Sequence, residues 1–103
     1  MALKQEKMKR PKVYIAGKYT GIEEAAEKMF NSSECRLEKA GFEVINPLGL
    51  VPKYTSWKDS MDKLLPEVKK CDAIALLPNW KDSIGASLEY KEALKHNLLV
   101  IFL

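Results

Sequence analysis

A segment from Leu77 to Glu89 carries side chains suited to ligand binding and chemistry. It follows an apolar run, residues 73–77, that is typical of a buried parallel strand, and it leads into a helical pattern. At such a junction in an open α/β sheet, backbone N–H groups face a ligand and the start of the helix favours anions. Small residues let that ligand approach the backbone closely. The segment therefore predicts a binding turn that contains Asn79, Trp80, Asp82, Ser83, Gly85 and Ala86.

Glu89 lies about one turn inside the predicted helix, where a carboxylate adds nothing to anion binding. This position suggests chemistry, although a solvent-facing or salt-bridging helix residue is the open alternative. Ser83 is expected to cap the helix in either case, because its hydroxyl can accept from the first free N–H groups. Trp80 either covers the core or stacks on a ring of the ligand.

The hydrophobic pattern predicts the elements that position these residues. Strands are expected at residues 12–17, 42–45, 72–77 and 98–102, with helices at 22–40, 56–68 and 83–96 between them. Thr20 and Glu23 have capping-box spacing, and Pro66 is expected to kink or split the second helix. With right-handed crossovers, this order predicts one flavodoxin-like or Rossmann-like α/β domain. It would be a three-layer α/β/α sandwich whose four-stranded parallel sheet has the order 2-1-3-4.

In this strand order, the turns that follow the first and third strands meet at one crevice. The first strand and its turn then contribute Tyr14, Gly17 and Lys18, and the end of the second strand contributes Asn46. A ring, hydroxyls, a cation and a carboxylate suit a nucleoside or sugar phosphate. The spacing of the glycines is neither a dinucleotide fingerprint nor a Walker A loop. Lys18 is either a solvated cation or a phosphate partner.

Composition limits the classes of protein and of binding partner that remain possible. The chain has 103 residues, of which 47% are hydrophobic and 30% charged, as is typical of one soluble domain. The formal charge of +3 comes largely from a basic leader over residues 1–11, ahead of a domain over residues 12–103. The leader has no interleaved aromatic residues, so a nucleic-acid polymer is not expected as a partner. No stretch is long enough to span a membrane, so we expect no membrane partner and a cytoplasmic location.

Cysteine and histidine usage gives no sign of a metal site. Cys35 and Cys71 lack metal-ligand spacing and are expected to be buried thiols, which fits a reducing compartment. His96 lies at the far end of the third helix, on its surface. We therefore expect no metal and no cofactor.

Several short motifs occur together along the chain. They are Val13-Tyr14-Ile15-Ala16-Gly17, Asn46-Pro47, Trp57 with Met61, Cys71-Asp72-Ala73-Ile74, and Trp80-x-x-Ser83-x-Gly85-Ala86-x-x-Glu89. Over residues 12–103 the chain resembles the small bacterial and phage DUF4406 proteins. Those proteins resemble, more remotely, the nucleoside 2-deoxyribosyltransferase superfamily, which also includes deoxynucleoside monophosphate N-glycosidases.

The resemblance implies a role for each group at the crevice. Glu89 would attack the anomeric carbon of a deoxyribose and form a covalent glycosyl intermediate, since a carboxylate stabilises an oxocarbenium-like transition state. Tyr14 would lie near the sugar and the nucleophile, and Asp82 would handle the base or its proton. Ser83, Gly85 and Ala86 would contact a 5′-hydroxyl or phosphate. The loop Lys18-Tyr19-Thr20 departs from the Ser/Arg-rich phosphate loop of the monophosphate glycosidases.

These observations favour a nucleoside or nucleotide N-glycosidase or deoxyribosyltransferase. The alternatives are a nucleotide-binding module without chemistry and an interaction protein with a vestigial pocket. The apolar run at residues 98–103 would form a sheet edge, which invites association with another copy of the chain. Trp57 and Met61 share a helical face and are expected to be core or oligomer contacts rather than ligand contacts. A homo-oligomer, dimer or tetramer, is therefore predicted.

Overall fold

A computed structural model of the protein describes residues 9–103. The predicted leader at residues 1–11 lies mostly outside these residues, and the domain boundary stays a prediction. In chain order the elements are β1 (Lys12–Ala16), α1 (Glu23–Lys39), β2 (Glu43–Ile45), α2 (Trp57–Val68), β3 (Ala73–Leu76), α3 (Ile84–Lys95) and β4 (Leu99–Phe102). Two short 3₁₀ helices, η1 (Pro47–Gly49) and η2 (Trp80–Asp82), follow β2 and β3.

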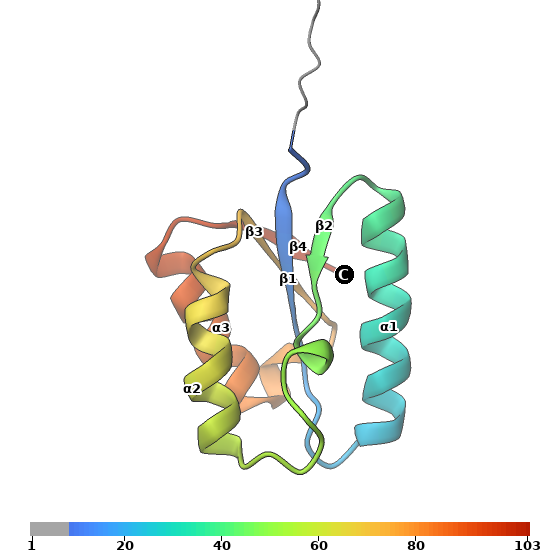
Figure 1. The fold of residues 1–103 in the computed structure, drawn as a ribbon, viewed down its shortest axis with the longest axis vertical. Coiled ribbons are helices and arrows are strands. Elements are labelled where there is room, and N and C mark those ends of the chain that lie inside the picture. The colour runs from blue at the N-terminus through green and yellow to red at the C-terminus, as the bar shows by residue number, and fades with distance from the viewer. Residues whose placement is uncertain (1–8) are drawn as a thin grey trace, which may run out of the picture.

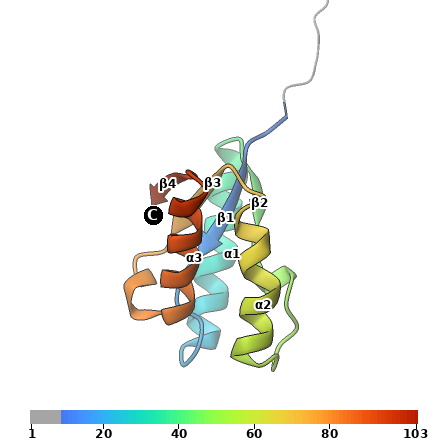
Figure 2. The same cartoon turned by 90° about the vertical axis from the view of Figure 1, so that its left-hand side faces the viewer.

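The four strands form one parallel sheet in the order β2-β1-β3-β4, which confirms the predicted topology. Helix α1 covers one face of the sheet, and α2 and α3 lie side by side on the other (Figures 1 and 2). The molecule is therefore the expected three-layer α/β/α sandwich. All three helices begin at the edge where the strands end, so their N-termini gather around the carboxyl ends of β1 and β3.

Two apolar clusters, one on each face of the sheet, form the core. Val13 and Ile15 of β1 belong to the cluster under α1, whereas Tyr14 and Ala16 belong to the cluster under α2 and α3. This alternation follows from the pleat of a strand, which sends successive side chains to opposite faces. The phenol of Tyr14 is thus delivered to the side of the sheet where α3 packs.

The ends of α1 illustrate one correct and one incorrect prediction. Gly41 has φ +105°, and the N–H of Phe42 donates to the Leu37 carbonyl at 3.1 Å, so a glycine stop ends α1 within one residue of the predicted end at residue 40. Thr20 does not cap the helix. A turn at Gly21, with φ +90°, places Ile22 at the N-cap without a side-chain bond.

Helix α2 starts as predicted, because the Ser56 hydroxyl accepts from the Asp59 N–H at 3.1 Å. It continues through Pro66 to Val68, so the predicted split does not occur. Pro66 lies in the last turn, where the missing N–H removes a single helical hydrogen bond.

Two further sequence predictions can be compared with the structure. Cys71 is buried, but Cys35 lies on the exposed side of α1, so the prediction of two buried thiols is wrong for Cys35. No helix within residues 9–103 is long and apolar enough to cross a membrane.

Candidate functional site

A buried hydrogen bond joins Tyr14 of β1 to Glu89 of α3. The Tyr14 hydroxyl donates to Glu89 Oε2 at 2.6 Å, and the exposed fractions of the two residues are 0% and 5%. Small residues bring the helix close enough for this contact, because Ala86 and Ala93 are the α3 side chains that join the core cluster around Tyr14. A tyrosine and a glutamate that are 75 residues apart in sequence thus form one unit.

The surroundings of Glu89 favour its neutral form. Burial raises the pKa of the Glu89 carboxyl from 4.5 to about 8, and the hydrogen bond from Tyr14 offsets only part of that rise. Burial, with the nearby Glu89 charge, holds the pKa of Tyr14 well above its usual 10.0. At pH 7 the Glu89 side chain is therefore mostly a carboxylic acid. Desolvation thus outweighs the stabilisation that the Tyr14 hydroxyl gives to the ionised carboxylate.

A cavity of about 240 Å³ opens at the carboxyl ends of β1 and β3, where the strand order predicts a crevice. Ligand sites for small molecules usually enclose roughly 300–1,000 Å³, so this cavity fits part of a nucleotide rather than all of it. The structure brings four predicted site residues to its wall: Lys18, Asp82, Ser83 and Gly85. Thr20, Trp57 and Ile84 complete the wall.

Glu89 is not part of that wall. It lies one helical turn beyond Gly85, on the same side of α3, and α2 covers this part of the helix. A Cβ on Gly85 would come within 3.2 Å of Met61 Sδ and 3.4 Å of Trp57 Nε1. Met61 and Trp57 of α2 therefore lie beside the first turn of α3 at Gly85.

Three predicted binding residues hold the loops around the cavity in place. The Ser83 hydroxyl accepts from the Ala86 N–H at 3.0 Å, so Ser83 is the N-cap of α3 and this backbone donor is already used. Asn79 Oδ1 accepts from the Lys18 N–H at 3.0 Å and ties the loop after β3 to the loop after β1. Close packing against Leu77 explains the glycine at position 17, because a Cβ there would lie 2.4 Å from Leu77 Cδ1.

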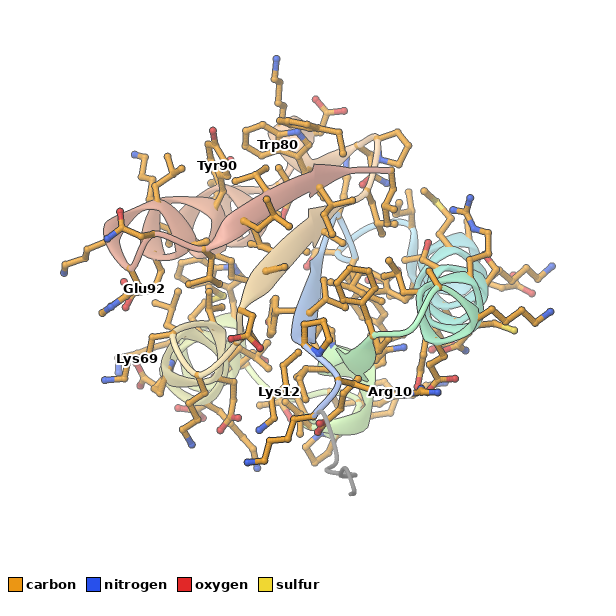
Figure 3. All side chains as sticks on the ribbon, turned by 90° about the horizontal axis from the view of Figure 1, so that it is seen from above. Arg10, Lys12, Lys69, Trp80, Tyr90 and Glu92 are labelled. Carbon is orange, nitrogen blue, oxygen red and sulfur yellow. The ribbon has the colours of Figure 1, made fainter. Side chains whose placement is uncertain are left out.

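Two other predicted binding residues lie elsewhere. Asn46 faces α1, where its Nδ2 donates to Glu34 Oε1 at 2.9 Å and its Oδ1 accepts from the Leu48 N–H at 3.0 Å. Trp80 packs on Tyr90 with ring centroids 4.7 Å apart, and Lys81 Nζ lies 5.9 Å from the Trp80 ring centre. Figure 3 shows Trp80 and Tyr90 together at the β4 edge of the sheet.

Sequence reasoning missed Trp57 as a cavity residue. Its helical spacing with Met61 indicates a shared apolar face, and Met61 is indeed buried. Trp57, however, is the first residue of α2 and 51% exposed. The position of Trp57 directly after the N-cap Ser56 indicates a cavity residue, since helix starts in this topology lie at the ligand-binding edge.

A larger cavity of about 990 Å³ lies at the opposite edge, between the start of β1 and the end of α1. Its wall mixes cations such as Arg10 and Lys70 with acids such as Glu43 and Asp72. Asp72 Oδ2 accepts from the Lys12 N–H at 2.8 Å and ties the starts of β1 and β3 together. This cavity is lined from the amino ends of the strands, whereas Lys18, Asp82, Ser83 and Gly85 line the smaller one, so we take the smaller cavity as the candidate site. In the described part of the chain, no three His, Cys, Asp or Glu side chains gather as metal ligands do.

Two solved structures share this fold. A 2-deoxyribosyltransferase from Leishmania mexicana superposes with a TM-score of 0.70 at 16% identity, covering 90% of this chain and 63% of the other. The CMP N-glycosidase BcmB of Clostridium botulinum gives a TM-score of 0.64 at 22% identity, covering 88% and 69%. The present chain thus spans less than two thirds of the Leishmania enzyme, and the likeness establishes the fold.

The family itself is established by sequence. The model of the DUF4406 family, a domain of unknown function, matches residues 11–102. The chain therefore belongs to the DUF4406 family. No curated protein matches the sequence.

The raised pKa of Glu89 predicts how stability changes with pH. An unfolded chain ionises this carboxyl near 4.5, whereas the folded chain holds the proton up to about 8. Between these values the folded state binds more protons, so the Glu89 contribution to the free energy of unfolding should fall by about 1.4 kcal/mol per pH unit. Glu89→Gln, which stays neutral, should lack this slope. Urea denaturation at several pH values tests the prediction, with Glu24→Gln on the exposed side of α1 as control. Identical slopes for the wild type and Glu89→Gln would contradict it.

Proposed function

We propose that this protein cleaves the N-glycosidic bond of a nucleoside or nucleotide, as a hydrolase or a deoxyribosyltransferase, with Glu89 as the nucleophile. The observation that carries the proposal is the buried Tyr14–Glu89 hydrogen bond one turn below the cavity. The two enzymes of similar structure, a 2-deoxyribosyltransferase and a CMP N-glycosidase, support the same reaction class. The expected cytoplasmic location stays part of this proposal.

The two carboxyl oxygens of Glu89 have different roles in this proposal. Tyr14 bonds to Oε2 and fixes the orientation of the group, which leaves Oε1 free to attack. Oε1 forms a bond to the anomeric carbon while the bond from that carbon to the base nitrogen breaks, and the electron pair leaves with the base. Asp82 lies on the cavity wall, and in this proposal it donates a proton to the leaving base. Water, or the nitrogen of a second base, then displaces Glu89 from the glycosyl ester.

Protonation of Glu89 sets the working pH of this reaction. The nucleophile must be ionised, and a pKa of about 8 leaves about a tenth of the molecules ionised at pH 7. Activity should therefore rise from neutral pH through pH 8. The carboxylate also needs a path to the sugar. Met61, a flexible side chain that packs over Gly85, is the side chain that has to move aside.

A nucleotide-binding module without catalysis is the second candidate, and the state of Glu89 favours it. The side chain is 5% exposed and mostly protonated at neutral pH, as a structural buried acid would be. In this alternative Tyr14 and Glu89 stabilise the core and the cavity binds a ligand only.

Chromatographic detection of free base separates the two candidates. Wild-type protein should release base from 2′-deoxynucleosides or their 5′-monophosphates, and Glu89→Gln should abolish release because an amide does not form the glycosyl ester. A hydrogen bond to a charged group is worth about 1.5–3 kcal/mol, so Tyr14→Phe should lower kcat by about 10- to 100-fold. Glu92→Gln, on the same helix, is the matched control and should leave the rate unchanged.

Adding a second free base shows whether the sugar passes to it or to water. Base release by Glu89→Gln at the wild-type rate would remove Glu89 as the nucleophile. If no substrate is cleaved but a nucleotide raises the melting temperature, the binding module is correct.

We also propose that the protein is a homo-oligomer that associates through β4. This edge strand leaves Leu99 and Phe102 exposed by 62% and 69%, and residues 98–103 contain no charge that would discourage pairing. Sedimentation equilibrium at micromolar concentration should give a dimer or tetramer, and Phe102→Lys should shift it toward the monomer. Lys91→Ala on α3 is the control. A monomer mass for the wild type would reject this proposal.

A further inference from the structure

Two tryptophans lie near the crevice, and their environments differ. One face of the Trp80 ring packs against Tyr90, and Lys81 lies over the ring. Trp80 is thus occupied at the β4 edge and does not line the cavity (Figure 3). Trp57 lines the cavity and remains half exposed. The aromatic surface available to a ligand at this cavity is therefore that of Trp57.

The indole of Trp57 is also held in place. It starts α2, whose first turn is capped by Ser56, and its Nε1 edge lies 3.4 Å from the position that a Cβ on Gly85 would take. The first turn of α3 lies beside one edge of the ring, while about half of the residue's surface stays open. Lys18 and Asp82 stand on the same cavity wall and supply a cation and a hydrogen-bond acceptor.

An oriented aromatic face with a few polar groups around it is the arrangement that recognises a planar base. An exposed indole gains free energy when a ring covers it, whereas a sugar or a phosphate offers no flat surface to stack on. The cavity of about 240 Å³ is also the size for one part of a nucleotide. Gly85 lies beside the edge of the Trp57 indole, and Glu89 follows Gly85 by one turn on α3.

We propose that Trp57 is the base-stacking residue of the site, so that α2 supplies the base specificity and α3 the nucleophile. This inference rests on the proposed function and names the part of the substrate that the cavity takes. Stacking depends on ring area, so purine substrates should rely on Trp57 more strongly than pyrimidine substrates.

The test uses Trp57 as its own reporter. Trp80→Phe leaves Trp57 as the single indole of the chain, and Glu89→Gln in the same protein prevents turnover. Titration with 2′-deoxyadenosine or 2′-deoxycytidine 5′-monophosphate should change the Trp57 emission saturably. The midpoint should match the Kd from calorimetry. The base-free control, 2-deoxyribose 5-phosphate, should leave the emission unchanged.

Substitution of Trp57 supplies the second readout. Stacking on an aromatic side chain is worth about 1–3 kcal/mol per base, so Trp57→Ala should weaken nucleotide binding by about 5- to 100-fold. Trp57→Phe keeps a smaller ring and should fall between Trp57→Ala and the wild type, which also guards against a loss of folding. Unchanged nucleotide affinity in Trp57→Ala, or emission that responds to the base-free sugar phosphate, would overturn the inference while base release by the wild type still supports the function. Absence of both nucleotide binding and base release would reject the function and the inference together.

Discussion

The hydrogen bond between Tyr14 and Glu89 requires that a carboxyl group stay in a nearly water-free core, and much of the fold can be understood from that requirement. Burying a charge without a partner is far more costly than burying a neutral acid with a hydrogen-bond donor. The chain meets this condition with the phenol of a central strand, and the small residues Ala86 and Ala93 let α3 lie close to it. A shift of α3 along the sheet would leave both polar groups unsatisfied.

At the carboxyl ends of β1 and β3, next to this pair, the loops are held mainly by close packing. Gly17 lies against Leu77, and Gly85 lies against Met61 and Trp57, with no room for a methyl group at Gly17. The Asn79 side chain then joins the two loops, and Ser83 fixes the start of α3. These contacts hold Lys18, Asp82 and Trp57 around a small cavity, while Glu89, the proposed nucleophile, stays buried one turn deeper. In the proposed function, recognition would take place at the surface and chemistry in the interior.

The elements and their order could be predicted from the sequence because the signals are local and strong. Uninterrupted apolar runs mark β1 and β3 as central strands, and Ser56, Ser83 and Gly41 mark helix ends through specific hydrogen bonds or a positive φ. The position of Glu89 inside α3 also follows from the sequence. Its burial and raised pKa do not, because they depend on how closely α2 and α3 pack, and that depends on contacts between distant residues.

The contacts of the side chains around the crevice could not be predicted from the sequence either. Trp57 and Trp80 are the same residue type, each beside the start of a helix, yet Tyr90 engages one and the cavity exposes the other. Asn46 ends its strand at the expected edge, but α1 offers it Glu34 as a hydrogen-bond partner on the opposite face. Strand order brings backbones together, whereas the partners of each polar side chain are set by the neighbouring helices.

The protonation state of Glu89 distinguishes a buried neutral acid from a solvated carboxylate. Its side-chain carboxyl carbon can be followed by nuclear magnetic resonance across the pH range, with Glu89→Gln identifying the signal. We expect a midpoint near 8, displaced upward in Tyr14→Phe because the hydrogen bond that favours the ionised form is lost. A midpoint near 4.5, the ordinary value for a solvated glutamate, would contradict this expectation.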